Sequence, residues 1–395
     1  MKTDDVVKLY DKYVMNTYKR VPLCFDKAQG ANVVDIDGKK YLDFFPGWAV
    51  SGTGHCHPKV AEAVAKQASR LMHVSNNYYS LEQAMLAKTI IENSFPGKVF
   101  FANSGAEANE TAVKLARKYG HDKGKYEVIT MLKSFHGRTL AMITATGQDK
   151  VKKGFEPLPE GFKYVTFGDI EALNNAISAK TIAVMLEPIQ CEGGINIASK
   201  EYMKALRALC DEKGLLLIFD EVQTGVGRSG KMFCYQTCGV TPDIMTLAKA
   251  LGGGLPIGAC VARENVQDVL TPGTHASTFG GSPIVCAAAL AVFDAIKKEK
   301  LLQNVSKMSA YIVKKLEGLK KKYLFISQIR AVGLIIGVEL NIPGEEIYKL
   351  CLEEGLLINC TQETVLRIMP PMTVTRSEID KAIAILDKVF SKVRS

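Results

Sequence analysis

Three polar features in this chain of 395 residues lie at positions where they could bind a ligand. Ser104-Gly105-Ala106 opens a predicted helix, and the unpaired N–H groups of a helix N-terminus suit an anion such as a phosphate. Asp220 follows five apolar residues, so its carboxylate is expected at the end of a strand. Lys249 is bracketed by apolar residues, and desolvation would lower its pKa and make its amine a nucleophile. Taken singly, these features also fit a plain N-cap, a turn cap and a surface lysine.

The three features together fit one ligand, pyridoxal 5′-phosphate (PLP). Its phosphate suits the helix N-terminus, its pyridine nitrogen needs an acidic partner, and its aldehyde forms a Schiff base with a lysine. We therefore expect Ser104, Asp220 and Lys249 to meet around this cofactor.

The elements that must position these residues follow from the apolar patterns. Predicted strands cover 98–102, 126–132, 181–186 and 215–219, and predicted helices cover 108–120 and 200–213. Ser104 and Glu107 form a predicted capping box at the start of the first helix. Alternating strands and helices predict an α/β fold with a mostly parallel sheet flanked by helices. Ligands of such sheets bind beyond the carboxyl ends of the strands, where the polar features fall.

The change in pattern along the chain predicts two domains and an N-terminal segment. Residues 1–55 are expected to pack with the small domain and to contain a hairpin that turns at Asp37-Gly38. Residues 56–285 are expected to form the large PLP-binding domain. Residues 286–395 are expected to form a smaller α/β domain. Its predicted elements are helices up to 319, a strand pair near 329–340 and helices near 345–355 and 377–393.

Composition and charge argue against several classes of protein. The net charge of +9 is dispersed, and its lysine pairs lack interleaved aromatic residues, which disfavours nucleic-acid binding. Ten cysteines without a CxxC pair, in a chain without a secretion signal, indicate free thiols and no structural metal site. No apolar run approaches the about 18 residues of a membrane span. We therefore expect a cytoplasmic protein without a membrane partner.

A glycine-rich stretch at 225–230 matches G-x-G-x-x-G and nearly matches a P-loop. Met232 stands where a P-loop needs Ser or Thr for Mg²⁺. A dinucleotide fingerprint must open an amphipathic helix, and residues 231–236 do not continue as one. We therefore expect a flexible loop and no nucleotide site.

A series of motifs in this chain resembles those of the class III PLP-dependent aminotransferases, most closely the acetylornithine/ornithine group. They are Gly54-His55-Cys56-His57-Pro58, Asn103-Ser104-Gly105-Ala106-Glu107-Ala108-Asn109, Ser134-Phe135-His136-Gly137-Arg138-Thr139, Glu187-Pro188-Ile189-Gln190, Phe219-Asp220-Glu221-Val222-Gln223-Thr224-Gly225 and Ser277-Thr278-Phe279-Gly280-Gly281. The resemblance runs from about Tyr13 to Val389. It implies the PLP-dependent transferase fold type I.

The resemblance also implies a set of cofactor-binding residues. Lys249 would form the Schiff base and later shuttle a proton, and Asp220 would keep the pyridine nitrogen protonated. The other contacts would be Ser104, Gly105 and Ala106 at the phosphate, Phe135 on the ring, Gln223 at the phenolic oxygen, and Thr278 at the phosphate of the partner subunit. The last contact implies a homodimer with shared active sites.

Four further residues are implied to bind substrates. Arg138 would take a substrate carboxylate, and Ser277 would lie near the amino acid across the interface. Glu192 and Arg367 resemble a switch pair: Glu192 neutralises Arg367 for an ω-amine, and its displacement frees Arg367 for the α-carboxylate of glutamate. An ordinary salt bridge is the alternative.

The reaction implied is ping-pong transfer of the δ-amino group of N2-acetylornithine to 2-oxoglutarate, in arginine biosynthesis. Alternative donors are ornithine, succinylornithine, 4-aminobutyrate and the succinyl-diaminopimelate intermediate. A PLP isomerase or racemase and a non-catalytic binding protein on the same fold are the alternatives from other classes. The chain departs from the family pattern at Cys191, Ser282 and Trp48. We expect Cys191 to restrict the loop that carries Glu192 and Trp48 to line the entrance of the site.

Overall fold

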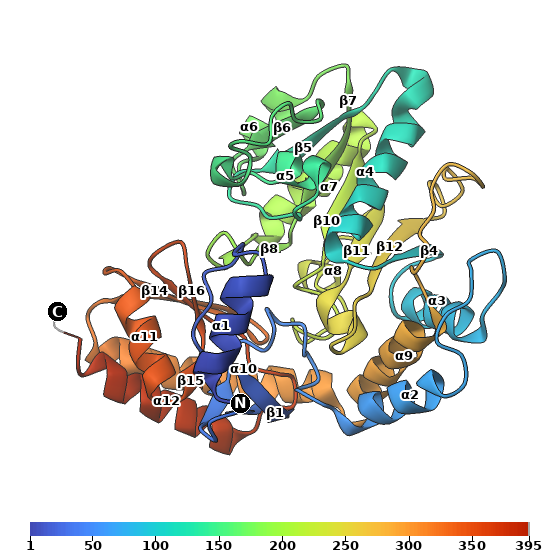
Figure 1. Ribbon diagram of the computed structural model, residues 1–395. Helices are drawn as coiled ribbons and strands as arrows, with labels where there is room; N and C mark the ends of the chain where they lie inside the picture. The colour runs from blue at the N-terminus through green and yellow to red at the C-terminus, as the bar shows by residue number, and fades with distance from the viewer. Residues whose placement is uncertain (394–395) are drawn as a thin grey trace.

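A seven-stranded sheet forms the centre of the computed structural model, which describes residues 1–393 (Figure 1). Its strand order is β4-β12-β11-β10-β7-β5-β6. The strands are β4 (Gly97–Ala102), β5 (Glu127–Met131), β6 (Phe162–Val165), β7 (Thr181–Leu186), β10 (Leu216–Asp220), β11 (Ile244–Leu247) and β12 (Gly258–Arg263). All are parallel except β12, which pairs antiparallel with both β11 and β4. The predicted mostly parallel α/β sheet is therefore confirmed.

The strand β10 shows why these apolar runs become central strands. All of its residues are buried, and alternate side chains point to opposite faces of the sheet. Leu217 and Phe219 belong to one apolar core cluster, and Leu216 and Ile218 belong to a second. A strand buried on both faces reads as a continuous apolar run, which is the pattern that the sequence shows here.

Two helices cover the opposite faces of this sheet. The helix α4 (Gly105–Gly120) places Ala112 and Leu115 in one cluster, and α7 (Lys200–Lys213) places Met203 and Leu206 in the other. The predicted bounds of α7 are confirmed, and Gly214 ends the helix with a φ of 64°.

Further helices and short strands lie outside the central sheet. They are α1 (Thr3–Tyr13), α2 (Pro58–Ala68), α3 (Leu81–Asn93), α5 (Leu140–Ala145), α6 (Ile170–Ala176), α8 (Tyr235–Cys238), α9 (Pro283–Lys298), β8 (Ile189–Gln190) and β9 (Asn196–Ile197). The helix α9 packs against α2 and α3 beside the large sheet (Figure 1).

The C-terminal region contains a second sheet, with order β13-β14-β17-β16 and antiparallel pairing throughout. Its elements are α10 (Leu301–Lys322), β13 (Ile326–Val332), β14 (Ile335–Leu340), α11 (Glu345–Glu353), β15 (Leu356–Leu357), β16 (Asn359–Thr361), β17 (Val365–Ile368) and α12 (Arg376–Phe390). The predicted strand pair and both predicted helices are present. Residues 394 and 395 of the expected small domain lie outside the described residues.

The N-terminal strands join this C-terminal region. The strands β1 (Phe25–Gln29), β2 (Asn32–Asp35) and β3 (Lys40–Asp43) form a sheet with β15, in which β3 and β15 are parallel. The blue N-terminal strands accordingly lie beside the orange and red C-terminal elements in Figure 1. The division into segments 1–55, 56–285 and 286–395 stays a prediction.

The glycine-rich stretch at 225–230 is a succession of turns and opens no helix. Its side chains are packed rather than open to solvent, and Arg228 is 1% exposed. The expected loop is therefore present, but the burial of its side chains argues against the expected flexibility.

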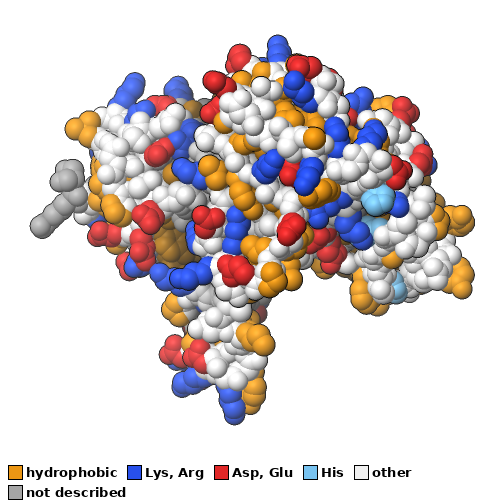
Figure 2. All heavy atoms as spheres, turned by 90° about the horizontal axis from the view of Figure 1, so that it is seen from above, with side chains coloured by type: hydrophobic (Ala, Val, Ile, Leu, Met, Phe, Trp, Pro, Cys, Tyr) orange, Lys and Arg blue, Asp and Glu red, His pale blue; other side chains and the backbone are white. Residues whose placement is uncertain are grey.

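The surface charges and the cysteines agree with the expectations from composition. Basic and acidic side chains are interspersed over the face that Figure 2 shows. All ten cysteines are free thiols, as predicted. Within residues 1–393 no cluster of three or more His, Cys, Asp or Glu side chains could hold a metal ion. In the same part of the chain, every helix is too short or too polar to span a bilayer.

Candidate active site

A cavity of about 450 Å³ opens beyond the carboxyl ends of the central strands. It gathers nine of the residues predicted for the site: Ser104, Gly105, Ala106, Phe135, Arg138, Glu192, Asp220, Gln223 and Lys249. Arg367 reaches the cavity through its ion pair with Glu192. Ser277 and Thr278 are not among the lining residues of the single chain.

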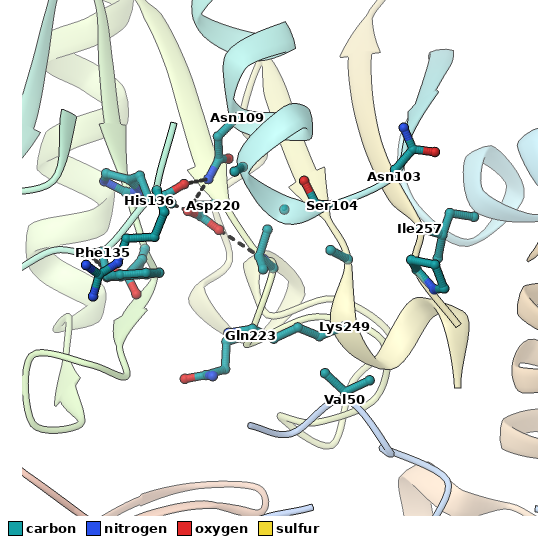
Figure 3. A pocket seen from close by; sticks show the side chains of 18 of the residues that line it. Val50, Asn103, Ser104, Asn109, Phe135, His136, Asp220, Gln223, Lys249 and Ile257 are labelled. Atoms are coloured by element: carbon teal, nitrogen blue, oxygen red, sulfur yellow. Dashed lines mark hydrogen bonds and ion pairs between the residues drawn. The ribbon is translucent and has the colours of Figure 1, made fainter. Parts of the chain in front are cut away.

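Asp220, the last residue of β10, is held by three donors. Its Oδ2 accepts hydrogen bonds from Asn109 Nδ2 at 2.7 Å and from His136 Nδ1 at 2.8 Å, and its Oδ1 accepts from the Val222 backbone N–H at 3.0 Å. Figure 3 shows Asp220 between His136 and Asn109. Asn109 is oriented in turn by Thr246, whose hydroxyl donates to Asn109 Oδ1 at 2.6 Å. The carboxylate is therefore fixed in position and buried at the base of the cavity.

Sequence reasoning missed Asn109 and His136 as partners of Asp220, although both lie inside the motifs quoted above. Asn109 carries a usable signal, because it lies three residues before Ala112 on the buried face of α4. A polar side chain on an apolar helix face needs a buried partner. His136 Nε2 is buried and has no partner among the described residues.

Lys249 begins a 3-10 turn directly after β11 and has a φ of 47°. This left-handed conformation is strained for a residue with a Cβ atom, and such strain concentrates at functional sites. Burial lowers the pKa of Lys249, although Glu192, Cys191 and Asp220 act in the opposite direction. Its amine makes no hydrogen bond or ion pair with any residue that the structure describes. An unpartnered amine with a lowered pKa suits Schiff-base chemistry.

The start of α4 forms the predicted anion seat. Ser104 Oγ accepts from the Glu107 N–H at 3.2 Å, so the cap is present. The predicted capping box is only half formed, because Glu107 Oε2 accepts from the Asn103 backbone N–H at 2.6 Å and not from that of Ser104. A Cβ atom on Gly105 would lie 2.7 Å from Val222 Cγ1, so the turn needs a glycine. The N–H groups of Gly105 and Ala106 begin the helix and have no intrahelical acceptor.

Phe135 lies on the cavity wall above a buried acid. Its backbone N–H donates to Glu187 Oε2 at 3.0 Å. Burial and, next, the Asp220 carboxylate raise the pKa of Glu187 well above its usual range. Arg138 is exposed at the rim, with its guanidinium carbon 5.5 Å from the centre of the Phe135 ring.

These residues fit PLP by their chemistry. A helix N-terminus can hold the phosphate, the fixed carboxylate of Asp220 suits a protonated pyridine nitrogen, and the unpartnered amine of Lys249 suits the aldehyde. All three groups line one cavity. The donor set predicted from the sequence is thus assembled in space.

Glu192 and Arg367 form a bidentate ion pair at the cavity wall. Arg367 Nη1 lies 2.6 Å from Glu192 Oε1, and Nη2 lies 3.3 Å from Oε2. The Arg367 side chain is completely buried, whereas that of Glu192 is 21% exposed. The pair is therefore closed here, with the acid on the accessible side.

Two of the three departures from the family pattern, Trp48 and Cys191, lie near this pair. The indole of Trp48 lies 5.2 Å from the guanidinium carbon of Arg367. The sequence predicts that Trp48 lines the entrance, but Trp48 is not among the residues that line the cavity, whereas Val50 is. Cys191 is buried and its carbonyl accepts from Arg367 Nη1 at 3.0 Å, which holds the loop before Glu192. Ser282 precedes α9 and makes no side-chain cap.

The segment with Ser277 and Thr278 is tied to its own chain but turned outward. Ser277 Oγ accepts from Asn103 Nδ2 at 3.2 Å and from the Gly280 N–H at 3.0 Å. Thr278 is exposed. The role predicted for Thr278 concerns a second subunit, so it stays a prediction.

Known proteins resemble this chain over its whole length. Residues 13–390 match the family described as "Aminotransferase class-III". An acetylornithine aminotransferase of Methanocaldococcus jannaschii is 51% identical, with 100% of both chains covered. An acetylornithine aminotransferase of Caldanaerobacter subterraneus is 54% identical over 97% of this chain and 98% of the relative.

A solved structure agrees in fold and in cofactor. The ornithine aminotransferase of Toxoplasma gondii superposes with a TM-score of 0.94 at 34% identity, over 98% of this chain and 94% of that one. That structure is described as having PLP at partial occupancy at its active site. The chain with Lys249 and Asp220 in one cavity belongs to the class-III aminotransferases, which are PLP-dependent enzymes.

Proposed function

We propose that the protein transfers the δ-amino group of N2-acetylornithine to 2-oxoglutarate, a reaction that would serve arginine biosynthesis. One observation carries the proposal: the buried Arg367 is paired with Glu192, whose side chain is 21% exposed and lines the same cavity as Lys249. The site must accept an ω-amine in one half-reaction and glutamate, with its α-carboxylate, in the other. An arginine with a removable acid serves both. The acetylornithine relatives reported above support the choice of donor.

The residues at the cofactor divide the chemistry between them. PLP supplies the aldehyde and an electron-withdrawing ring. Lys249 would hold the aldehyde of the cofactor through Nζ, and its amine, once free, would serve as the group that moves a proton. Asp220 holds a proton at the pyridine nitrogen, with its carboxylate oriented by Asn109 and His136. Gly105 and Ala106 bind the phosphate with their N–H groups.

Three other side chains complete this assignment. Ser104 caps the helix that seats the phosphate, Phe135 stacks on the ring, and Gln223 contacts the phenolic oxygen. Gln223 Nε2 donates to the Trp48 carbonyl at 3.2 Å, which orients its amide. Arg138, exposed at the rim, binds a substrate carboxylate in bidentate fashion.

We further propose a homodimer in which Thr278 of one subunit binds the phosphate held by the other, with Ser277 near the substrate. Exposed apolar side chains surround the segment, among them Met72, Tyr78 and Phe279. Asn76 ties the two regions together by donating to the Ser277 carbonyl at 2.9 Å. A contiguous exposed apolar patch is typical of an interface with another protein.

The test is rapid mixing of the PLP form, without a keto acid, with one amino donor at a time. The donors are N2-acetylornithine, ornithine, succinylornithine, 4-aminobutyrate, the succinyl-diaminopimelate intermediate and glutamate. We expect N2-acetylornithine to bleach the absorbance of the bound cofactor fastest, with glutamate also competent. A clear preference for any other ω-amine would contradict the substrate, and product formation without 2-oxoglutarate would point to an isomerase.

Ornithine is the second candidate. The likeness to the Toxoplasma gondii ornithine aminotransferase in fold favours it. The acetylornithine relatives are more similar in sequence, with 51% and 54% identity against 34%. The same mixing experiment separates the two donors.

A further inference from the structure

Arg367 has two kinds of partner in the structure, one removable and one built into the fold. Glu192 is the removable partner, on the accessible side. On the opposite edge, Asn359 Oδ1 accepts from Arg367 Nη2 at 2.8 Å and from Nε at 3.1 Å. The guanidinium therefore keeps two hydrogen bonds to a neutral amide oxygen, and these do not depend on the position of Glu192.

Backbone pairing places Asn359 at this position. Asn359 in β16 lies directly opposite Arg367 in the antiparallel pair with β17. Cross-strand partners on one face have their Cβ atoms about 5 Å apart, so the amide meets the guanidinium without a mobile loop between them. Its place is fixed by the sheet that also carries the arginine.

Aromatic rings restrict the guanidinium further. Its central carbon lies 4.5 Å from the centre of the Phe45 ring and 5.2 Å from that of Trp48. These distances are within the range of cation–π attraction. The rings stabilise the cation when its acid partner is absent.

The backbone at Glu192 is fixed as well. Its carbonyl accepts from Thr361 Oγ1 at 2.8 Å and from Gln362 Nε2 at 3.0 Å. Both donors belong to the hairpin that carries Asn359 and Arg367. Opening the ion pair therefore needs rotation of the Glu192 side chain only, while the loop and Arg367 stay in place.

We propose that Asn359 is a positioning residue for the half-reaction that uses glutamate and 2-oxoglutarate. It holds the plane of Arg367, so that rotation of Glu192 uncovers a preformed seat for the α-carboxylate. The inference rests on the proposed function, because it assumes two half-reactions that differ in Arg367. In the ω-amine half-reaction Glu192 itself aligns the guanidinium, so Asn359 is dispensable there.

The test compares the two half-reactions in Asn359→Leu, which keeps the size of the side chain and removes the acceptor. Each is followed by the absorbance of the bound cofactor, with N2-acetylornithine or with glutamate. Hydrogen bonds to charged groups contribute enough to bind a substrate roughly 10- to 100-fold more tightly. We expect kcat/KM for glutamate to fall by about that factor, chiefly through KM, and the rate with N2-acetylornithine to stay within about twofold. Asn341→Leu, at an exposed position of the same region, is the matched control.

A loss of equal size in both half-reactions, or in neither, would overturn the proposal. A second comparison uses the Glu192→Gln background, where Arg367 has no acid to release. There Asn359→Leu should still weaken glutamate, and disappearance of its effect would show that Asn359 acts only through the ion pair. If the leucine variant does not fold, Asn359→Ala removes the same acceptor with a smaller side chain, and the same selective loss is expected. A wild-type protein inactive with either substrate would refute the proposed function instead.

Discussion

The cofactor side and the substrate side of the cavity are built in different ways. On the cofactor side, Asp220 accepts three hydrogen bonds and is buried at the end of a central strand. On the substrate side, Arg367 is equally buried, but its charge is balanced by a Glu192 side chain that remains partly exposed. The first arrangement has one state, and the second has a member that can move.

The difference follows from what each side must recognise. The cofactor is the same in both half-reactions, so a fully satisfied, rigid network stabilises it without cost to turnover. The two substrates differ in an α-carboxylate that reaches this site. A buried arginine without a negatively charged partner would lower the stability of the protein whenever that carboxylate is absent. A movable acid answers both needs.

Loss of Lys249 should have the largest effect on this comparison. We expect Lys249→Ala to lower the transamination rate by about 10³-fold or more, because the proton shuttle is lost together with the covalent link. The visible absorbance of the lysine-bound cofactor should disappear as well. Lys98→Ala, a surface lysine, is the control. Retention of a lysine-type absorbance in Lys249→Ala would refute the assignment.

Asp220→Asn should have the next largest effect, because it disrupts the hydrogen-bond network on the cofactor side. Both carboxylate oxygens accept N–H donors, so an amide nitrogen at either place would face a donor and the negative charge would be lost. We expect the rate of each half-reaction, followed separately with one substrate at a time, to fall by about 100-fold. Asp268→Asn, an exposed acid, should have no effect. A selective loss with one substrate would contradict the division between the two sides.

Thr278→Ala should weaken cofactor retention by about tenfold, the value of one hydrogen bond to a charged group. Mixing Thr278→Ala with Lys249→Ala subunits gives a sharper result. If sites are shared, the mixed dimer contains one intact site, and tight cofactor binding at a competent lysine reappears although each parent variant lacks it. Absence of any recovery in dimers shown to have exchanged would exclude the cross-subunit contact.

Glu187→Gln should have the smallest effect, although Glu187 lies next to Asp220. Burial and the neighbouring Asp220 raise the pKa of Glu187 well above its usual range, which favours the uncharged form of its carboxyl group. The uncharged amide is therefore a close substitute. We expect activity within about threefold of the parent protein.

The same residue makes a stability prediction with a definite sign. Because the pKa of Glu187 is raised on folding, its contribution to stability is lost as pH rises above the unfolded value of about 4.5. The unfolding free energy of Glu187→Gln, relative to the parent, should therefore increase as the pH of urea titrations is raised from about 5. A constant difference over these titrations would mean that Glu187 is ionised in the folded protein.

Local patterns predicted much of the fold correctly. The bounds of α7 are right because a cap, an apolar stripe and a terminal glycine all lie within one short segment. The antiparallel β12 was not predicted, because pairing direction depends on which strands become neighbours. The prediction of a capping box at Ser104 was half right. Ser104 caps the helix, but Glu107 accepts from the backbone N–H of Asn103 instead of that of Ser104.

The sequence by itself determined the cofactor side. Ser104, Asp220 and Lys249 each follow a strand or open a helix, so parallel strands that end at one edge bring them together whatever the loops do. The family resemblance implied the pair of Glu192 and Arg367, but only the tertiary structure decided the geometry of the substrate side and the place of Asn359 in it. Asn359, Glu192 and Arg367 meet because β16 pairs with β17 and a loop from 175 positions earlier packs against them. Such contacts depend on the packing of distant segments, and no local periodicity encodes them.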